Sequence, residues 1–167
     1  MRSSFFTIRV QKLFQERSDT MAKRKRKKQP IDLFCPYCGR PALFRPSPYV
    51  YGEDCVEPDS FVYVCSGFPG KCDAYVRAHA HNLRPKGIMA DKELRHLRIV
   101  AHRALDSVWK GGWMTRNETY AWLANKMGLR EKEMHIGYFS YYYCQEVIRI
   151  CQTFVEERKK LEKEREK

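Results

Sequence analysis

The chain has 167 residues, of which 43% are hydrophobic and 31% charged, and its formal net charge is +12. It has no run of about 18 apolar residues, which excludes a membrane-spanning helix, and Thr7 and Arg9 interrupt the opening segment, which therefore lacks the apolar core of a signal peptide. We expect a cytosolic protein with a core no larger than that of one domain and with no membrane partner.

The positive charge is concentrated near the N-terminus. Residues 1–30 contain ten Lys or Arg against two acidic residues, and six of the basic residues are consecutive: Lys23, Arg24, Lys25, Arg26, Lys27 and Lys28. Such a block repels itself and stays disordered until it meets an anion. We therefore expect residues 1–30 to be a disordered basic extension. Within it, residues 1–20 either form a short amphipathic helix or are an extension that precedes a natural translation start at Met21.

Residues 31–82 have the composition of a small β domain. Short aromatic and β-branched stretches predict strands at 43–44, 49–51 and 61–64, with Gly and Pro residues between them. A segment of this size buries too little apolar surface to fold alone, so a bound metal ion would supply the missing stability.

Four cysteines in this segment have the spacing of zinc ligands. Cys35 and Cys38 are separated by two residues and followed by Gly39, and Cys65 and Cys72 form a looser second pair after the strand at 61–64. Two such turns reach one tetrahedral Zn²⁺ in a zinc ribbon, and four thiolates leave no open position for a substrate. The spacing therefore predicts one structural zinc ion on Cys35, Cys38, Cys65 and Cys72.

The other cysteines and two histidines are weaker candidates. Seven cysteines without a secretory signal indicate metal ligands and buried thiols rather than disulfides. Cys55 competes for ligand status but lies in an acidic loop without a nearby partner. Cys144 and Cys151 are on the apolar face of a predicted helix, which favours buried free thiols. His79 and His81 are interpreted as polar loop residues, with metal ligation as the alternative.

From residue 83 onward the apolar residues recur at helical spacing. A first helix is predicted from an N-cap at Asp91 to the glycine pair 111–112. Thr115 and Glu118 form a capping box that opens a second helix, which Gly128 ends. The apolar stripe of the first helix comprises Leu94, Leu97, Ala101, Ala104, Leu105 and Val108.

A third helix begins near Ser140, and the charged segment 156–167 that follows it is a solvated helix or a frayed tail. The gap of about a dozen residues before it is too long for a helix-turn-helix, whose turn has about three or four residues. We therefore expect an α+β fold, in which a small β zinc ribbon at 31–82 packs with a three-helix bundle at 83–155.

The residues of the ribbon resemble known zinc modules. Residues 35–39 and 61–75 are similar to the zinc ribbons at the C-terminus of type I DNA topoisomerases, which hold zinc on four cysteines and contact single-stranded DNA. A longer set resembles a zinc-finger-containing family found largely in bacteriophages and prophages; it comprises the ribbon with 85–90, 93–95, 101–102, 106, 109–110, 120–124 and 135–137. The resemblance implies the fold, the zinc ion and a phage context in the cytoplasm of a host cell, but no activity.

Basic and aromatic side chains make nucleic acid, single-stranded or without sequence preference, the expected partner. The run at 23–28 would neutralise phosphates, and rings beside the zinc ligands would stack on unpaired bases. The candidate contacts are this run and the ribbon residues Arg40, Arg45, Tyr63, Phe68, Lys71 and Arg77. The remaining ribbon aromatics are divided between stacking and the core: Tyr37, Phe44, Tyr49, Tyr51 and Phe61. The alternative for the basic run is a solubilising tail.

Two other functions compete with nucleic-acid binding. The nearly balanced charge of 31–155 favours a protein–protein module that docks on a host polymerase or defence complex. A nuclease that uses His79, His81, His102 and Asp106 is the enzymatic alternative. The sequence has no Gly-rich phosphate loop, no paired-carboxylate motif and no open metal site, so we expect a protein that is not an enzyme.

One polar stripe on the first predicted helix needs its own interpretation. Arg95, Arg98, His102 and Asp106 recur at helical spacing, and His102 and Asp106 are one turn apart. We interpret the stripe as an internal network that packs the helix against the ribbon, with phosphate contact or catalysis as the alternative.

Overall fold

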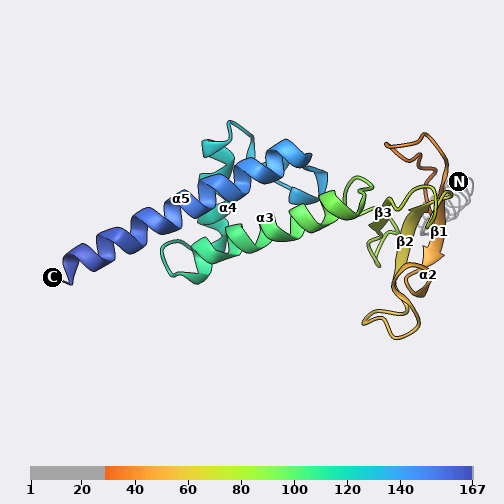
Figure 1. The fold of residues 1–167 in the computed structure, drawn as a ribbon, viewed down its shortest axis with the longest axis horizontal. Helices are drawn as coiled ribbons and strands as arrows, with labels where there is room; N and C mark the ends of the chain where they lie inside the picture. The colour runs from red at the N-terminus through yellow and green to blue at the C-terminus, as the bar shows by residue number, and fades with distance from the viewer. Residues whose placement is uncertain (1–28, 167) are drawn as a thin grey trace, which may run out of the picture.

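The chain folds into a small β lobe followed by a larger helical lobe, and the first long helix leads from one into the other (Figure 1). The computed structural model describes residues 29–166. The predictions for the basic run at 23–28, and for residues 1–28 as a whole, lie outside this range. The fold is α+β, as the sequence predicts.

The β lobe is a three-stranded antiparallel sheet. Its strands are β1 (Ala42–Pro46), β2 (Phe61–Cys65) and β3 (Tyr75–Arg77), hydrogen-bonded in that order. The first two contain the strands predicted at 43–44 and 61–64. The third was not predicted, because three residues carry too little alternation to be recognised in a sequence.

The prediction of a strand at 49–51 is wrong, because these residues belong to the short helix α2 (Pro48–Tyr51). A proline at the first helical position has its φ already fixed at a helical value. The carbonyl oxygen of Ser47 accepts hydrogen bonds from the backbone N–H groups of Val50 and Tyr51, both at 3.0 Å. Local turn chemistry therefore overrides the β propensity of the aromatic residues.

The core of the β lobe is built around the ring of Tyr63. The strand register places Tyr63 between Phe44 on β1 and Val76 on β3, so the three side chains share one face of the sheet. The Tyr63 hydroxyl donates to the carbonyl of Leu83 at 2.7 Å and accepts from the backbone N–H of Ile31 at 3.1 Å. Only 1% of Tyr63 is exposed.

Three α-helices and two short 3₁₀ turns form the helical lobe. They are α3 (Lys92–Lys110), α4 (Arg116–Lys126), η1 (Glu131–Glu133), η2 (Ile136–Tyr138) and α5 (Tyr141–Arg165). Within residues 29–166, no helix combines the length and the apolarity that crossing a bilayer requires. Residues 156–165 of α5 are exposed, which matches the solvated helix predicted there.

The predicted caps of the first two helices are confirmed, and the third helix begins after Ser140, as predicted. The Asp91 carboxylate accepts from the backbone N–H of Leu94 at 2.8 Å, and the Ser140 side chain caps α5. Thr115 and Glu118 form the complete capping box of α4. Each cap satisfies backbone N–H groups that the first turn of a helix leaves without partners.

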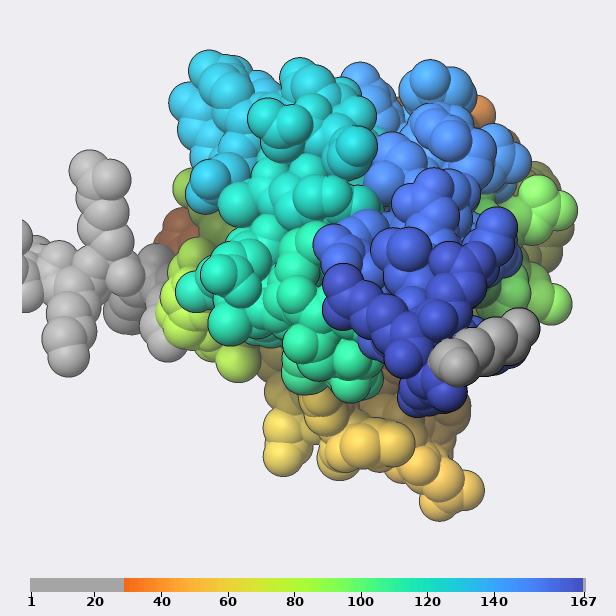
Figure 2. All heavy atoms as spheres, turned by 90° about the vertical axis from the view of Figure 1, so that its left-hand side faces the viewer, coloured from red at the N-terminus to blue at the C-terminus, as the bar shows by residue number. Residues whose placement is uncertain are grey.

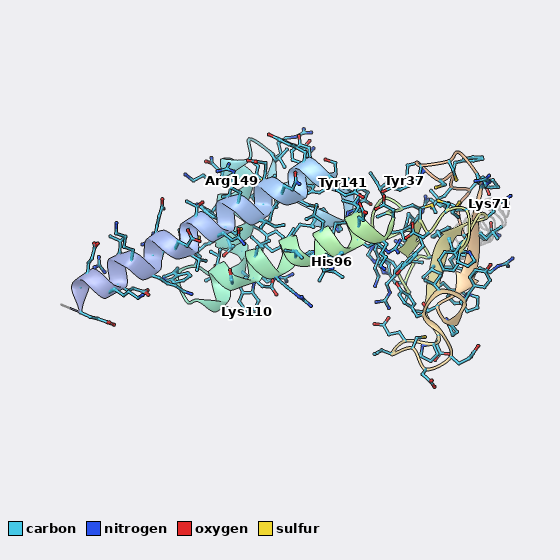
Figure 3. All side chains as sticks on the ribbon, viewed as in Figure 1. Tyr37, Lys71, His96, Lys110, Tyr141 and Arg149 are labelled. Atoms are coloured by element: carbon cyan, nitrogen blue, oxygen red, sulfur yellow. The ribbon has the colours of Figure 1, made fainter. Side chains whose placement is uncertain are left out.

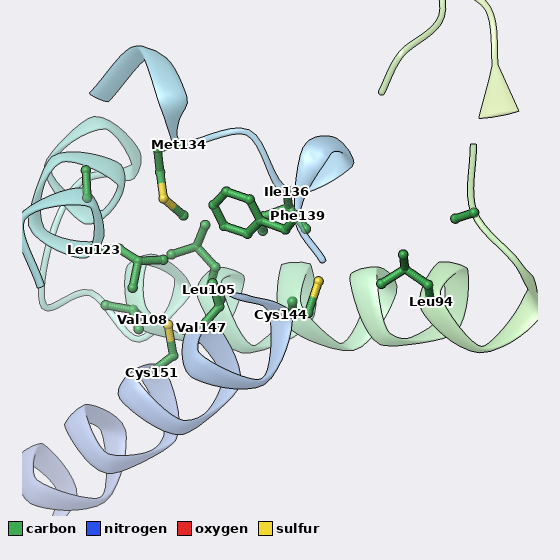
Figure 4. Close-up of a cluster of buried hydrophobic side chains, with 13 residues drawn as sticks. Leu94, Leu105, Val108, Leu123, Met134, Ile136, Phe139, Cys144, Val147 and Cys151 are labelled. Atoms are coloured by element: carbon green, nitrogen blue, oxygen red, sulfur yellow. The ribbon is translucent and has the colours of Figure 1, made fainter. Parts of the chain in front are cut away.

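The helical core combines the predicted stripes with a segment that the sequence did not assign to it. Leu105 of α3, Leu123 of α4 and Val147 of α5 are fully buried against one another (Figure 4). Residues 129–139, predicted only as a loop, add Met134, Ile136 and Phe139 to this cluster. Cys144 and Cys151 are buried free thiols here, as predicted.

The two lobes meet through backbone and tyrosine contacts. Tyr75 of β3 pairs with Ala90 in an antiparallel bridge, just before α3 begins. Tyr37 of the β lobe and Tyr141 of α5 lie close together in Figure 3, and both bind Asp91. The Tyr141 hydroxyl donates to the carboxylate at 2.7 Å, and the Tyr37 hydroxyl accepts from the Asp91 backbone N–H at 3.2 Å. The N-cap of α3 is therefore also the joint between the lobes.

Candidate metal centre

The first pair of metal-ligating cysteines sits in a tight turn before β1. The backbone N–H of Cys35 donates to the carbonyl of Arg40 at 2.8 Å, and the N–H of Gly39 donates to the carbonyl of Cys35 at 2.9 Å. Gly39 has a φ of +68°, a conformation that side chains disfavour. This glycine lets the chain reverse within four residues, so that Cys35 and Cys38 point the same way.

The second pair comes from the end of β2 and the loop after it. The backbone N–H of Gly67 lies 3.4 Å from the Cys65 sulfur and donates to it. The carbonyl of Gly67 in turn accepts from the N–H groups of Lys71 and Cys72 at 2.9 and 3.2 Å. The loop is thereby folded back, and it carries Cys72 to the first pair.

The four sulfur atoms converge on one point. The Sγ atoms of Cys35 and Cys72 are 3.6 Å apart, those of Cys38 and Cys65 are 3.4 Å apart, and all four lie within 4.8 Å of one another. A tetrahedral zinc ion with Zn–S bonds of about 2.3 Å holds its sulfurs about 3.8 Å apart. The predicted set of four cysteines thus forms a site for one structural zinc ion.

The thiols of this cluster differ in acidity. A hydrogen bond from the backbone N–H of Arg40 lowers the pKa of the Cys38 thiol to about 6. Burial raises the pKa of the Cys65 thiol to about 12 and also raises the pKa of the Cys72 thiol. Only a bound cation would keep Cys65 and Cys72 as thiolates at neutral pH, so zinc binding must release protons.

Other candidate ligands lie apart from this centre. In the part of the chain that the structure describes, the four cysteines are the one group of three or more metal-binding side chains that come together. Cys55 is not among them, as predicted. The rings of His79 and His81 are 5.2 Å apart without a third ligand.

Three of the predicted nucleic-acid contacts lie on or beside the zinc loops, and the Tyr49 ring links a fourth, Arg45, to them. Arg40 lies over Gly67, whose added Cβ would meet Arg40 and Lys71 atoms at 3.4 Å. The loop continues into Phe68, whose ring centre is 6.1 Å from that of Tyr49. The guanidinium of Arg45 is 5.9 Å from the same Tyr49 ring. We call Arg40, Arg45, Tyr49, Phe68 and Lys71 the knuckle surface.

The other two predicted ribbon contacts lie elsewhere. Tyr63 is a core residue, and its ring has no surface on which a base could stack, which corrects that prediction. Arg77 forms an ion pair with Glu57 at the opposite end of the sheet from the zinc site. Its charge is therefore already balanced by a carboxylate.

The polar stripe of α3 divides into two parts. Arg98 donates to the carbonyls of Phe139 and Ile88, both at 2.8 Å, and so ties α3 to the segments packed on it. Arg95 likewise donates to the carbonyl of Asp73 in the β lobe at 2.7 Å. This is the packing network predicted for the stripe.

At the far end of the stripe, Asp106 accepts hydrogen bonds from Trp109 at 3.2 Å and from Lys110 at 3.0 Å. These two contacts, rather than one with His102 a helical turn away, engage the Asp106 carboxylate. Burial lowers the pKa of His102, so its imidazole is mostly neutral at physiological pH.

Comparison with known proteins agrees with the geometry of the metal centre. No curated protein and no solved structure matches the chain. The pattern of one family, described as a zinc-finger-containing domain, matches residues 31–154, which include both lobes and all four cysteines. The chain therefore belongs to the zinc-finger-containing domain family.

Proposed function

We propose that this protein binds nucleic acid, single-stranded or without strong sequence preference, through the knuckle surface and the basic run at 23–28, and that it is not an enzyme. The observation that carries the proposal is a row of three cations and two rings that starts at the zinc loops and passes along Phe68 and Tyr49 to Arg45. The resemblance of the ribbon to the zinc ribbons of type I DNA topoisomerases, which contact single-stranded DNA, agrees with this role.

The knuckle surface has the chemistry that single strands require. Among residues 29–166, Arg40, Arg45 and Lys71 take part in no ion pair, so their charges are available to phosphates. Tyr49 is 48% exposed, and its ring adjoins that of Phe68. Exposed rings that border cations are the usual platform for unpaired bases, because every base has a face that can stack.

Most acidic side chains of the ribbon lie away from the zinc end of this surface, where Arg40 and Lys71 are found. The register pairs Ala42 with Cys65 at the zinc end of the sheet and Pro46 with Phe61 at the other end. The segment 47–60, which carries most of the ribbon carboxylates, therefore leaves the sheet at the end opposite the metal (Figure 1). Asp73 is paired with Arg95. A phosphate bound by Arg40 and Lys71 would therefore meet little repulsion.

Fluorescence anisotropy with labelled single-stranded DNA, duplex DNA and single-stranded RNA tests the proposal. The double variant Tyr49→Ala/Phe68→Ala should bind single strands roughly tenfold or more weakly, because each stacked base contributes about 1–3 kcal/mol. The matched control is Tyr138→Ala/Tyr142→Ala, which removes two exposed rings from the helical lobe and should bind like the wild type.

The salt dependence of binding distinguishes the contribution of the three cations from that of the two aromatic rings. Replacing Arg40, Arg45 and Lys71 by Gln should flatten the slope of log K against log salt by about two to three, whereas the ring variant should keep the slope. The proposal fails if the wild type, the deletion of residues 23–28 and the knuckle variants bind all three nucleic acids equally weakly at low salt.

A second candidate function is a protein–protein module that docks on a host protein. It is favoured by the exposed rings at the start of α5, where Tyr138 and Tyr142 are 52% and 65% exposed. Rigid aromatic side chains are common anchors of protein interfaces. A stoichiometric host partner that survives nuclease treatment, and that is lost with Tyr138→Ala/Tyr142→Ala, would select this function over the first.

A further inference from the structure

An apolar pocket lies between the β lobe and α3, and the proposed function does not use it. Its volume is about 330 Å³, and Tyr51, Tyr75 and Val76 line it from the ribbon. Ile88 and Ile99 line the other side and are 46% and 49% exposed. Two half-exposed isoleucines beside a pocket form an apolar patch, and burying this patch against a partner would be energetically favourable.

The charged residues around this pocket are all basic. Arg77, Lys86, Arg95 and Arg98 line it, and no carboxylate does. In the described part of the chain, Lys86 and Arg98 form no ion pair. The pocket therefore favours an apolar group that is flanked by negative charge.

The loop between α2 and β2 presents such a group. Its tip, Val56, is 98% exposed, and its carboxylates are those of Glu53, Asp54, Glu57 and Asp59. Only Glu57 forms an ion pair among the described residues. We call residues 53–59 the acidic loop. Figure 2 shows the gold segment around residue 55 projecting from the rest of the molecule.

The base of the acidic loop is held in place. The backbone N–H of Ser47 donates to the carbonyl of Ser60 at 2.8 Å, and the two hydroxyls are 2.6 Å apart. These hydrogen bonds fix the two ends of the loop that exposes Val56 to solvent. Docking of the loop would therefore cost less conformational entropy.

We propose that the acidic loop of one copy of this chain inserts Val56 into the basic apolar pocket of a second copy. Tyr51 and Arg77 line the pocket and also adjoin Asp54 and Glu57 of the loop, so both features open on the same side of the β lobe. A two-fold axis between them gives two identical contacts, each pairing a loop with a pocket. None of the five residues of the knuckle surface lines the pocket.

Sedimentation equilibrium of the full chain at increasing protein concentration tests the dimer. The wild type should dimerise, and salt should raise the dissociation constant, because the partner charges are opposite. Val56→Asp and Ile99→Glu each lie on the surface, and each should raise the dissociation constant at least tenfold. Leu161→Glu, which changes an equally exposed apolar residue on α5, should dimerise like the wild type.

Mixing the two variants separates this arrangement from any other dimer. In a mixed dimer the loop of the Ile99→Glu chain meets the pocket of the Val56→Asp chain, so one of the two contacts is intact. The mixture should therefore dimerise more strongly than either variant alone. A monomeric wild type at the highest concentration overturns the proposal, and so does a dimer unaffected by both variants. If the wild type is monomeric and Ile99→Glu weakens oligonucleotide binding, the pocket belongs to the nucleic-acid site instead.

Discussion

The guanidinium of Arg95 lies 3.7 Å from the centre of the Tyr75 ring. Arg95 is in the first turn of α3 and Tyr75 is on β3, so this stack joins the helical lobe to the edge strand of the ribbon. The same guanidinium donates to the carbonyl of Asp73 and pairs with its carboxylate. One side chain therefore combines three kinds of contact at the boundary between the lobes.

Removing this side chain should destabilise the protein. We expect Arg95→Ala to lower the free energy of unfolding by about 2 kcal/mol, because hydrogen bonds from a charged donor and the stack on Tyr75 are lost together. Urea titration followed by circular dichroism measures the change. Arg103→Ala, at an exposed site on the same helix, should stay within about 0.5 kcal/mol of the wild type, and equal losses in both variants would contradict the assignment.

The zinc ion should determine whether the β lobe folds. Cys35→Ser should lose stoichiometric zinc and, with it, stabilisation on the order of 10 kcal/mol for that lobe. Amide exchange should then become fast at Tyr63 and Val64 and remain slow at Leu105, which belongs to the other core. Cys55→Ser is the matched control and should retain one zinc per chain by elemental analysis. Zinc bound equally by both variants would refute the site.

A backbone contact at Gly87 leaves no room for a side chain. A Cβ added there would lie 2.2 Å from the carbonyl oxygen of Gly137. Gly87→Ala should therefore lower the free energy of unfolding by about 1–3 kcal/mol, since the two backbones must separate. Gly70→Ala, where a Cβ meets nothing within 4 Å, should change the melting temperature little. An unchanged free energy of unfolding in the Gly87→Ala variant would show that the backbones at Gly87 and Gly137 are farther apart than this.

The capping box of α4 gives a pH-dependent prediction. Thr115→Ala should cost about 1 kcal/mol, because the first turn loses its cap. A hydrogen bond from the backbone N–H of Thr115 lowers the pKa of the Glu118 carboxyl. The folded pKa is below the unfolded value, so this stabilisation is complete above the ordinary pKa of Glu and is lost as the pH falls through the lowered pKa.

Glu118→Gln isolates that contribution. Thermal melts of the wild type and of this variant, recorded between neutral and acidic pH, should converge as the pH falls below the range in which the wild-type carboxyl titrates. Curves that stay parallel over the whole range would mean that Glu118 does not act through its charge.

Local chemistry in the sequence accounts for the features that could be predicted. The four zinc ligands and the caps at Asp91 and Thr115 depend on residue type and short spacing, and all were placed correctly. The apolar stripe of α3 was also predicted, because its period persists from Leu94 to Val108. These patterns can be recognised in the sequence because the residues that form each of them are close together in the chain.

Features that depend on distant partners could not be predicted in this way. Tyr63 is in the core because β1 and β3 flank it, and no local pattern distinguishes it from the exposed Tyr49. Ile136 and Phe139 enter the helical core from a segment without helical period. The contact between Arg95 and Tyr75 joins residues from different lobes, so only the folded chain reveals it.

Residues 29–166 contain two hydrophobic cores with no residue in common, one around Tyr63 and one around Leu105. Only the first contains ligand cysteines, so a cell that runs short of zinc would be left with the helices of a partly folded protein. Three walls of the pocket, Tyr51, Tyr75 and Val76, belong to the metal-dependent part. Dimerisation through Val56 and the pocket would then depend on the zinc supply, although none of the four zinc-ligating cysteines lines the pocket.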